Sequence, residues 1–198
     1  MRAAQTHRTA LLDSAVRLFR KQGFAATGIN EILAASAVPK GSLYHYFPGG
    51  KAEIGVEALR LAAAKVTSTL GALAAEGLGP AELVERYFAL LGLWMRESGY
   101  RDGSPITTTV LEMAPQDEPI RAAAAEAYSA WAAVLEGAAI AQGMDPARAG
   151  RLARLSTATL EGALVQCRVA RDESPLIEAA AELAALFGSR GPMAQADS

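Results

Sequence analysis

Apolar residues recur at helical spacing along most of the chain, in stretches separated by short turn-forming segments. From Thr6 to Gln22, for example, one helical face carries Ala10, Leu11, Ala15, Leu18 and Phe19. Proline suits the first turn of a helix and glycine the position after its end, so both residues mark boundaries. The pattern predicts an all-α fold of about nine helices, near residues 6–22, 28–35, 39–47, 51–73, 81–97, 106–113, 118–142, 147–170 and 175–187. The last ten residues are polar, and we expect them to be frayed.

The second and third of these helices are short and closely spaced. Gly23 ends the helix before them, and we expect Thr27 to be the N-cap of the second helix. Pro39 opens the third helix after the turn at Val38. Two short helices joined by a tight turn form a helix-turn-helix, whose second helix typically enters the major groove of DNA.

The stretch from Val38 to Phe47 is rich in groups that can contact nucleic acid. Leu43 and Phe47 are four residues apart and would anchor one face of this helix to a core. One lysine, one serine, two tyrosines and one histidine occupy the other positions. A solvated helix seldom exposes so much aromatic surface without a partner, so we expect this stretch to lie in a DNA groove.

Charge is distributed unevenly along the chain. Residues 1–52 contain seven basic and two acidic residues, a balance of +5, so the remainder carries −7 of the total −2. A basic first quarter on an acidic body is typical of a DNA-binding head. Uneven scatter of surface charge is the alternative interpretation.

Composition excludes several other classes of protein. Alanine and leucine dominate a hydrophobic content of 51%, and no apolar run approaches the roughly 20 residues of a membrane span. The single cysteine, Cys167, allows no intramolecular disulfide and fits a cytoplasmic location, where we expect it to be a small core residue. The two histidines have no partner at metal-ligand spacing, and no phosphate loop or nucleophile motif is present. We expect no enzyme activity, cofactor or metal.

Several spaced residues of the first quarter together resemble the N-terminal domain of TetR-family transcriptional regulators. They are Gly23, Thr27, Ile32, Ala37-Val38 and the run Lys40 to Phe47. Three residues, Pro48-Gly49-Gly50, precede Lys51 where most family members have two, which is similar to the LmrA/YxaF-like subgroup. The resemblance implies a helix-turn-helix domain at residues 1–50 and a ligand-binding and dimerisation domain at residues 51–198, with helix 51–73 connecting the two.

Phosphate contacts fix a DNA-binding protein in register without reading base sequence. Thr27, Tyr46 and Lys51 are the candidates for this role, and Lys51 lies where a helix N-terminus adds partial positive charge. His45 can donate to a phosphate or to a base. Thr27 has an alternative role as a helix cap alone.

Base contacts are expected at the start of the third helix. Lys40 can donate to guanine, Ser42 to several bases, and the Tyr44 ring can lie on a thymine methyl group. Gly41 has no side chain, so its backbone can approach the duplex closely. Partial burial of Tyr44 within the head is the alternative for that residue.

The last two helices, 147–170 and 175–187, are apolar on more than one side. Glu161 is the only charged residue between Leu155 and Val165, and Glu178 and Glu182 are the only ones in the last helix. Such helices are usually buried on several sides, and in a monomer they would leave an exposed apolar patch. The family resemblance implies that they pair with their symmetry mates in a homodimer. Purely intramolecular packing is the alternative.

A small-molecule pocket is expected in the second domain. Its candidate lining is mainly apolar, with a few hydroxyl and indole groups, and suits a largely hydrophobic effector. The candidates are Tyr87, Leu91, Trp94, Met95, Thr107, Thr108, Leu111, Tyr128 and Trp131. Aromatic residues at helical spacing also occur as plain core, and that interpretation stays open for each of them. The loop residues Gly103-Ser104-Pro105 replace the Gly-Cys-Pro often found in related subgroup members, so no thiol sensing is expected there.

These patterns together predict a dimeric regulator, most simply a repressor, that binds a palindromic double-stranded DNA operator and is released by a small, mostly apolar effector. A palindrome follows from two-fold symmetry, with half-sites about 34–36 Å apart or a multiple of that spacing. The alternatives are a DNA-binding or interaction module without an effector, including one whose head meets protein or RNA.

Overall fold

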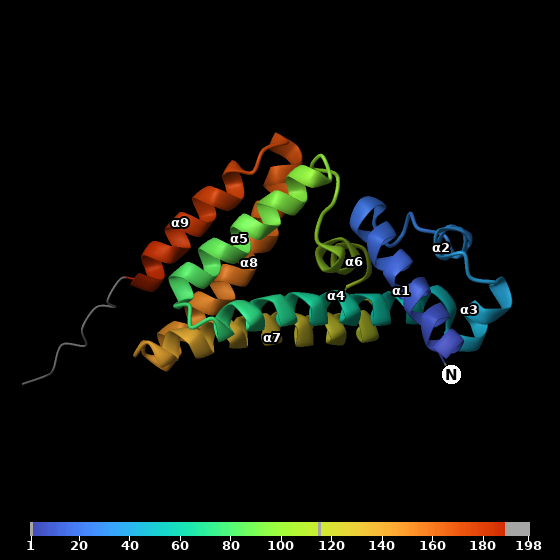
Figure 1. The fold of residues 1–198 in the computed structure, drawn as a ribbon, viewed down its shortest axis with the longest axis horizontal. Coiled ribbons are helices and arrows are strands. Elements are labelled where there is room, and N and C mark those ends of the chain that lie inside the picture. The colour runs from blue at the N-terminus through green and yellow to red at the C-terminus, as the bar shows by residue number, and fades with distance from the viewer. Residues whose placement is uncertain (1, 115, 189–198) are drawn as a thin grey trace, which may run out of the picture. The chain divides into compact units, whose positions relative to one another are not determined.

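The computed structural model describes residues 2–114 and 116–188, and for residues 2–5 only the backbone. All regular structure in this part of the chain is helical (Figure 1). The helices are α1 (Arg2–Gln22), α2 (Ile29–Ser36), α3 (Lys40–Tyr46), α4 (Gly50–Ala75), α5 (Pro80–Glu97), α6 (Pro105–Met113), α7 (Glu118–Ala141), α8 (Pro146–Ala170) and α9 (Ser174–Gly188). The predicted all-α fold is confirmed. The expected fraying of the last ten residues concerns positions outside the described ones.

Local sequence accounts for most of the helix boundaries. Gly23 follows α1 with a φ of +89°, a conformation that glycine adopts without steric cost. Pro39 is the N-cap of α3, and Pro80 is the first residue of α5. The Asp145 carboxylate accepts the Arg148 backbone N–H at 2.9 Å and so caps α8.

The predicted N-cap at Thr27 is wrong, because the N-cap of α2 is Gly28. Gly28 has no side chain to accept a hydrogen bond from the first turn. The Glu31 carboxylate, three residues into the helix, instead accepts the Gly28 N–H at 2.7 Å. This bond, followed by the Gln22 amide, lowers the pKa of Glu31. The reciprocal half of a capping box therefore starts α2 without a capping side chain.

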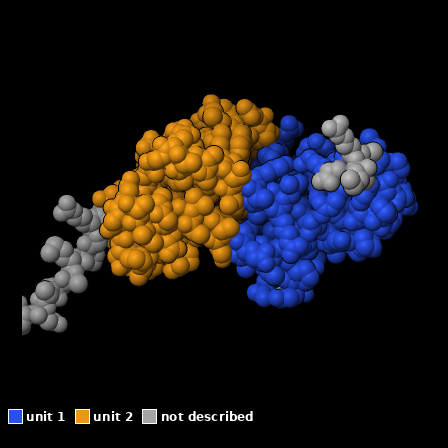
Figure 2. Space-filling model, turned by 60° about the horizontal axis from the view of Figure 1, so that its bottom comes forward, with its two compact units in different colours: residues 1–66, 101–127 blue, residues 67–100, 128–198 orange. Residues whose placement is uncertain are grey.

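Residue contacts divide the chain into two compact units, coloured separately in Figure 2. Unit 1 comprises residues 1–66 and 101–127, and unit 2 comprises residues 67–100 and 128–198. The long helices α4 and α7 each contribute one end to each unit. The expected division after residue 50 concerns function rather than packing, and it stays a prediction.

In unit 1 a single core joins α1, α2, α3 and the start of α4. Its fully buried side chains are Leu11, Phe19, Ile32, Leu43, Phe47 and Ile54. Phe24, from the turn after α1, lies directly against the α4 backbone at Gly55, where a Cβ would be 2.6 Å from the Phe24 ring. This packing fixes the orientation of the seven-residue α3, which is too short to be stable alone.

Unit 2 contains α5, α8 and α9, which lie side by side in Figure 1. Leu83 and Val84 of α5 and Leu176 of α9 are almost fully buried between them. Arg96 of α5 forms an ion pair with Glu173, just before α9. Cys167 on α8 is also fully buried, as expected for a core residue, and burial raises the pKa of its thiol. None of the helices described is long and apolar enough to cross a membrane.

Candidate nucleic-acid interface

Helix α3 buries one face and exposes the other. Leu43 and Phe47 have 0% exposure, which agrees with their expected anchoring role. Lys40, Gly41 and His45 are exposed, and 48% of Tyr44 is accessible. The exposed face therefore carries a cation, an open stretch of backbone, a phenol and an imidazole, all groups that contact DNA.

Ser42 and Tyr46 lie at the border between these two faces, where both are half-buried. The Tyr46 ring packs against the core of unit 1, and its edge meets the His45 imidazole at a centroid distance of 4.9 Å and an interplanar angle of 73°. An edge-to-face pair of this kind restricts both rings. The position of His45 is thus fixed although its surface is exposed.

Thr27 was expected to contact a phosphate, and the structure does not support this role for its side chain. Thr27 has 0% exposure, and its hydroxyl donates to the Gly23 carbonyl at 2.7 Å. A buried hydroxyl that already has an acceptor is more costly to expose than a surface one. Thr27 instead closes the turn between α1 and α2.

The backbone of Ala25, in the same turn, is held by two charged side chains. The Lys51 ammonium donates to the Ala25 carbonyl at 3.2 Å and lies 4.4 Å from the centre of the Phe24 ring. The Glu112 carboxylate of α6 accepts the Ala25 N–H at 2.6 Å. Burial lowers the pKa of Lys51, against the opposing effects of Glu112 and Glu31. Because an ammonium has three donors, a phosphate contact by Lys51 stays a prediction.

Two residues of this region were missed by the sequence analysis. Glu112 lies 87 positions from Ala25, and no local pattern links the two. A Cβ at Gly23 would come within 2.3 Å of a Glu112 carboxylate oxygen, so the glycine makes room for this contact. Asn30 is exposed in the first turn of α2 and adds an amide donor beside the turn. Its polar position directly after Gly28 was the available signal.

The predicted ligand residues are not gathered into one described cavity. Tyr87, Leu91, Met95 and Trp131 are buried in unit 2, where Trp94 is 39% exposed. Thr107, Thr108 and Leu111 belong to α6 in unit 1. The Thr108 hydroxyl donates to the Phe19 carbonyl of α1 at 3.3 Å, and Leu111 is 77% exposed. The lining role of these residues stays untested, and Tyr128 alone among them lines the cavity described next.

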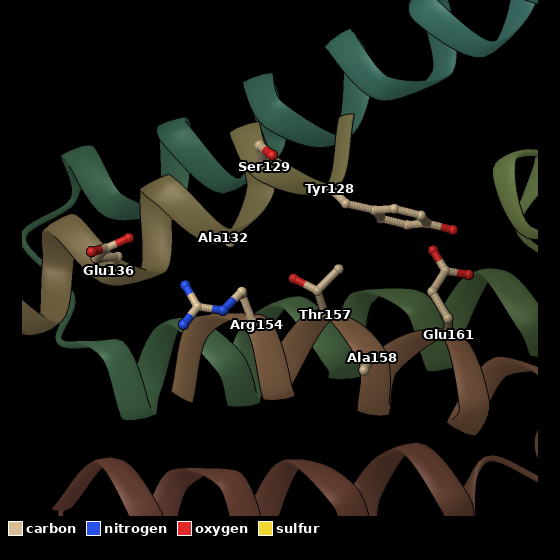
Figure 3. A pocket seen from close by; sticks show the side chains of 8 residues that line it. All are labelled: Tyr128, Ser129, Ala132, Glu136, Arg154, Thr157, Ala158 and Glu161. Atoms are coloured by element: carbon tan, nitrogen blue, oxygen red, sulfur yellow. The ribbon is translucent and has the colours of Figure 1, made fainter. Parts of the chain in front are cut away.

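This cavity lies in unit 2 between α7 and α8 and has a volume of about 550 Å³. Figure 3 shows side chains from the two helices facing each other across it. The lining residues are Tyr128, Ser129, Ala132 and Glu136 from α7 and Arg154, Thr157, Ala158 and Glu161 from α8. The sequence analysis missed it because α8 was interpreted only as a dimerisation helix. No cluster of three potential metal ligands occurs among the residues described.

The helix-turn-helix and its exposed face define the chain as a helix-turn-helix transcriptional regulator. Residues 11–58 match the family described as bacterial regulatory proteins of the tetR family. Residues 80–182 match the C-terminal domain of LmrA/YxaF-like transcriptional regulators. The chain therefore belongs to the TetR family, with a C-terminal domain of the LmrA/YxaF-like type. Members of this family are transcriptional regulators and not enzymes.

Individual relatives agree with this assignment. The chain is 35% identical to an uncharacterized HTH-type transcriptional regulator of Mycobacterium tuberculosis, over 87% of this chain and 89% of the relative. It is 31% identical to the HTH-type transcriptional regulator LmrA of Bacillus subtilis, over 86% and 90% of the two chains. The HTH-type transcriptional repressor DhaR of a Mycobacterium species is 23% identical over 85% and 86%.

Solved structures of TetR proteins share the fold. A regulatory protein TetR from Rhodobacter sphaeroides superimposes with a TM-score of 0.80 at 24% identity, over 90% of this chain and 97% of that one. A TetR transcriptional regulator from Chloroflexus aurantiacus gives a TM-score of 0.77 at 27% identity, over 96% and 98%.

Proposed function

We propose that the protein is a dimeric transcriptional repressor that binds a palindromic DNA operator and is released by a small-molecule effector. The observation that carries the proposal is α3, which is anchored by Leu43 and Phe47 and turns Lys40 and Tyr44 outward. Anchoring matters because base readout requires donors that are already in place when the helix meets the groove. The name of the relative DhaR supports a repressor rather than an activator.

Residues 1–50 would form the DNA-binding domain in this proposal, and residues 51–198 the regulatory domain. Lys40, Ser42 and Tyr44 would read bases, and the exposed backbone at Gly41 would allow close approach. Tyr46, Lys51 and His45 would contact phosphates, with Asn30 as a further donor. The site of action would be the cytoplasm, where the operator DNA is accessible.

A homodimer through α8 and α9 would place two α3 helices on the two halves of a palindrome. Exposed apolar or small residues follow α8 at alternating spacings of three and four, namely Leu155, Ala158, Gly162, Val165 and Val169. This spacing forms a seam like that of a coiled coil. Leu155 is 45%, Val165 50% and Val169 83% exposed. On α9, Ile177 is 57% exposed and continues the apolar surface.

Effector control is supported by the cavity between α7 and α8. Its volume of about 550 Å³ lies within the range of small-molecule sites, which starts near 300 Å³. A DNA-binding module without an effector would not need such a cavity. Relay to the head is supported by the Glu112–Ala25 bond, which ties α6 to the turn before α2.

The test starts from in vitro selection of duplexes from a random library, because the operator is unidentified. We expect the enriched sequences to be palindromic and to bind more tightly than random duplex at one fixed salt concentration. Substituting Lys40→Ala together with Tyr44→Ala should reduce operator affinity by about a hundredfold or more, since two base contacts of about 1–3 kcal/mol each are lost.

Lys65→Ala is the matched control. Lys65 is an exposed lysine on α4 that pairs with Asp13 at 2.9 Å, away from α3. Its removal should leave operator affinity within about twofold, because exposed ion pairs contribute little. Enrichment of non-palindromic duplexes, or equal affinity of the double variant and the wild type, would contradict the proposal.

A further inference from the structure

The cavity between α7 and α8 has a definite arrangement of charge. Arg154 and Glu136 face each other at one end, and Tyr128 and Glu161 lie at the other (Figure 3). Two carboxylates and one guanidinium give the lining a net charge of −1. Arg154 and Glu161 are seven residues apart on α8, which corresponds to about 10 Å along the helix.

The Glu161 end of the cavity combines a carboxylate with aromatic rings. The Tyr128 ring forms an edge-to-face pair with Trp131, with centroids 5.5 Å apart and an interplanar angle of 82°. Because Trp131 is 97% buried, this contact fixes the Tyr128 ring before any ligand arrives. Tyr87 of α5 is also near, since its hydroxyl pKa is raised by burial and then by the charge of Glu161.

A fixed aromatic ring beside a carboxylate is the arrangement that binds organic cations. The ring face attracts positive charge through its quadrupole, and the carboxylate adds direct attraction at an intermediate dielectric. A neutral apolar molecule gains neither contribution and leaves the carboxylate to be desolvated without compensation. A ligand anion would be repelled at this end.

The opposite end of the cavity suits a group without net charge. The Arg154 guanidinium and the Glu136 carboxylate approach the same point, because a Cβ at Gly150 would be 3.3 Å from the first and 3.1 Å from the second. Their charges largely cancel for a ligand placed beside both. Between the ends, Ala132, Ala158 and Thr157 offer small side chains that leave space for a slender apolar body.

We propose that this cavity binds an elongated monocation, with its ammonium or equivalent head between Tyr128 and Glu161 and its apolar body running toward Arg154 and Glu136. The ligand class thus differs from the neutral, mostly apolar effector expected from the sequence. The inference rests on the proposed effector-controlled function, since it names the chemistry of the effector.

The probe is (4-phenylbutyl)trimethylammonium, compared with the neutral isostere in which carbon replaces nitrogen and with 5-phenylpentanoate. Binding is measured by titration calorimetry and by the fluorescence of Trp131. We expect the cation to bind about tenfold or more tightly than either analogue, as cation–π and carboxylate contributions of about 1–2 kcal/mol require. Equal binding of the cation and its isostere would overturn the inference.

Three substitutions locate the head group. Glu161→Gln keeps the shape of the side chain and removes its charge, so affinity for the cation should fall about tenfold while that for the isostere stays unchanged. Tyr128→Phe should keep cation binding and Tyr128→Ala should lose it, because the ring rather than the hydroxyl is required. Glu182→Gln, at an exposed site on α9, is the matched control. Unchanged cation affinity in Glu161→Gln would place the ligand elsewhere.

Operator binding separates this inference from the proposed function. The selected duplex is titrated with wild-type protein, with and without saturating cation. Operator binding that the cation weakens supports both proposals. Operator binding combined with no detectable cation binding would overturn the ligand inference alone. Cation binding that follows the expected variant pattern, without any operator preference, would overturn the proposed function and leave the ligand class standing.

Discussion

Helices α3 and α8 both present large side chains to solvent, but the chemistry of their exposed faces is opposite. The exposed residues of α3 are a lysine, a tyrosine and a histidine, whereas those of α8 include Leu155, Val165 and Val169. The first set suits a hydrated, anionic duplex, and the second suits an equally apolar surface. Exposure alone therefore does not identify a partner, whereas the chemistry of the exposed groups separates a DNA face from a self-association face.

The two helices also differ in how they are held. The seven residues of α3 depend on Leu43 and Phe47, which insert into the core of unit 1. The 25 residues of α8 have nine buried positions and would keep their place without any one of them. The comparison predicts that α3 is fragile toward change in its anchors and tolerant on its outer face, with the reverse holding for α8.

Loss of an anchor should have the largest effect. Phe47→Ala removes a fully buried ring and should lower the free energy of unfolding of the head by about 3–5 kcal/mol. Tyr44→Ala on the same helix is the control and should cost less than about 1 kcal/mol, because 48% of that side chain is already exposed. Urea denaturation followed by circular dichroism measures both. Similar costs for the two would mean that α3 is not anchored as described.

A charge in the apolar seam of α8 should come next. Val165→Glu should weaken the proposed dimer by about a hundredfold, or roughly 3 kcal/mol, because it brings two like charges into an apolar interface. Sedimentation velocity over a range of concentrations measures the dissociation constant. Ala133→Glu, at an exposed site on α7, supplies the same charge outside the seam. If both variants dissociate alike, the seam is not the dimer interface.

The smallest effect should distinguish two glycines. Gly41→Ala in α3 meets no atom within 4 Å and should stabilise the head by about 0.5–1 kcal/mol, since alanine favours the helix, while operator binding weakens. Gly23→Ala should instead destabilise by about 1–2 kcal/mol, because its φ is +89° and its Cβ meets the Glu112 carboxylate. Thermal unfolding and fluorescence anisotropy with the selected duplex separate the two quantities. A stabilised Gly41→Ala that binds DNA normally would show that the backbone there does not approach the duplex.

Sequence reasoning succeeded where the determinants are local. The spacing of Leu43 and Phe47 identified the buried face of α3, and Gly23 and Pro39 identified where helices end and begin, because those effects act within a few residues. The burial of Thr27 was not predictable from its type, since serine, threonine and asparagine are equally suitable as surface caps.

Features that depend on distant residues were not predicted. The bond between Glu112 and Ala25 joins positions 87 apart, and its carboxylate resembles any other surface glutamate in the sequence. The cavity between α7 and α8 depends on two helices whose faces oppose each other only after folding. The sequence pattern did indicate that aromatic residues occur in α5 and α7, but most of them form the core of unit 2.

The burial of Cys167 has a practical consequence for spectroscopy. As the only cysteine of the chain, with 0% exposure and a thiol pKa raised by burial, it should resist maleimide reagents in the folded protein. A single cysteine introduced by Ser129→Cys, at an exposed position beside the cavity, would then be the one site that accepts a fluorophore. Site-specific labelling is thus available without first removing a native thiol.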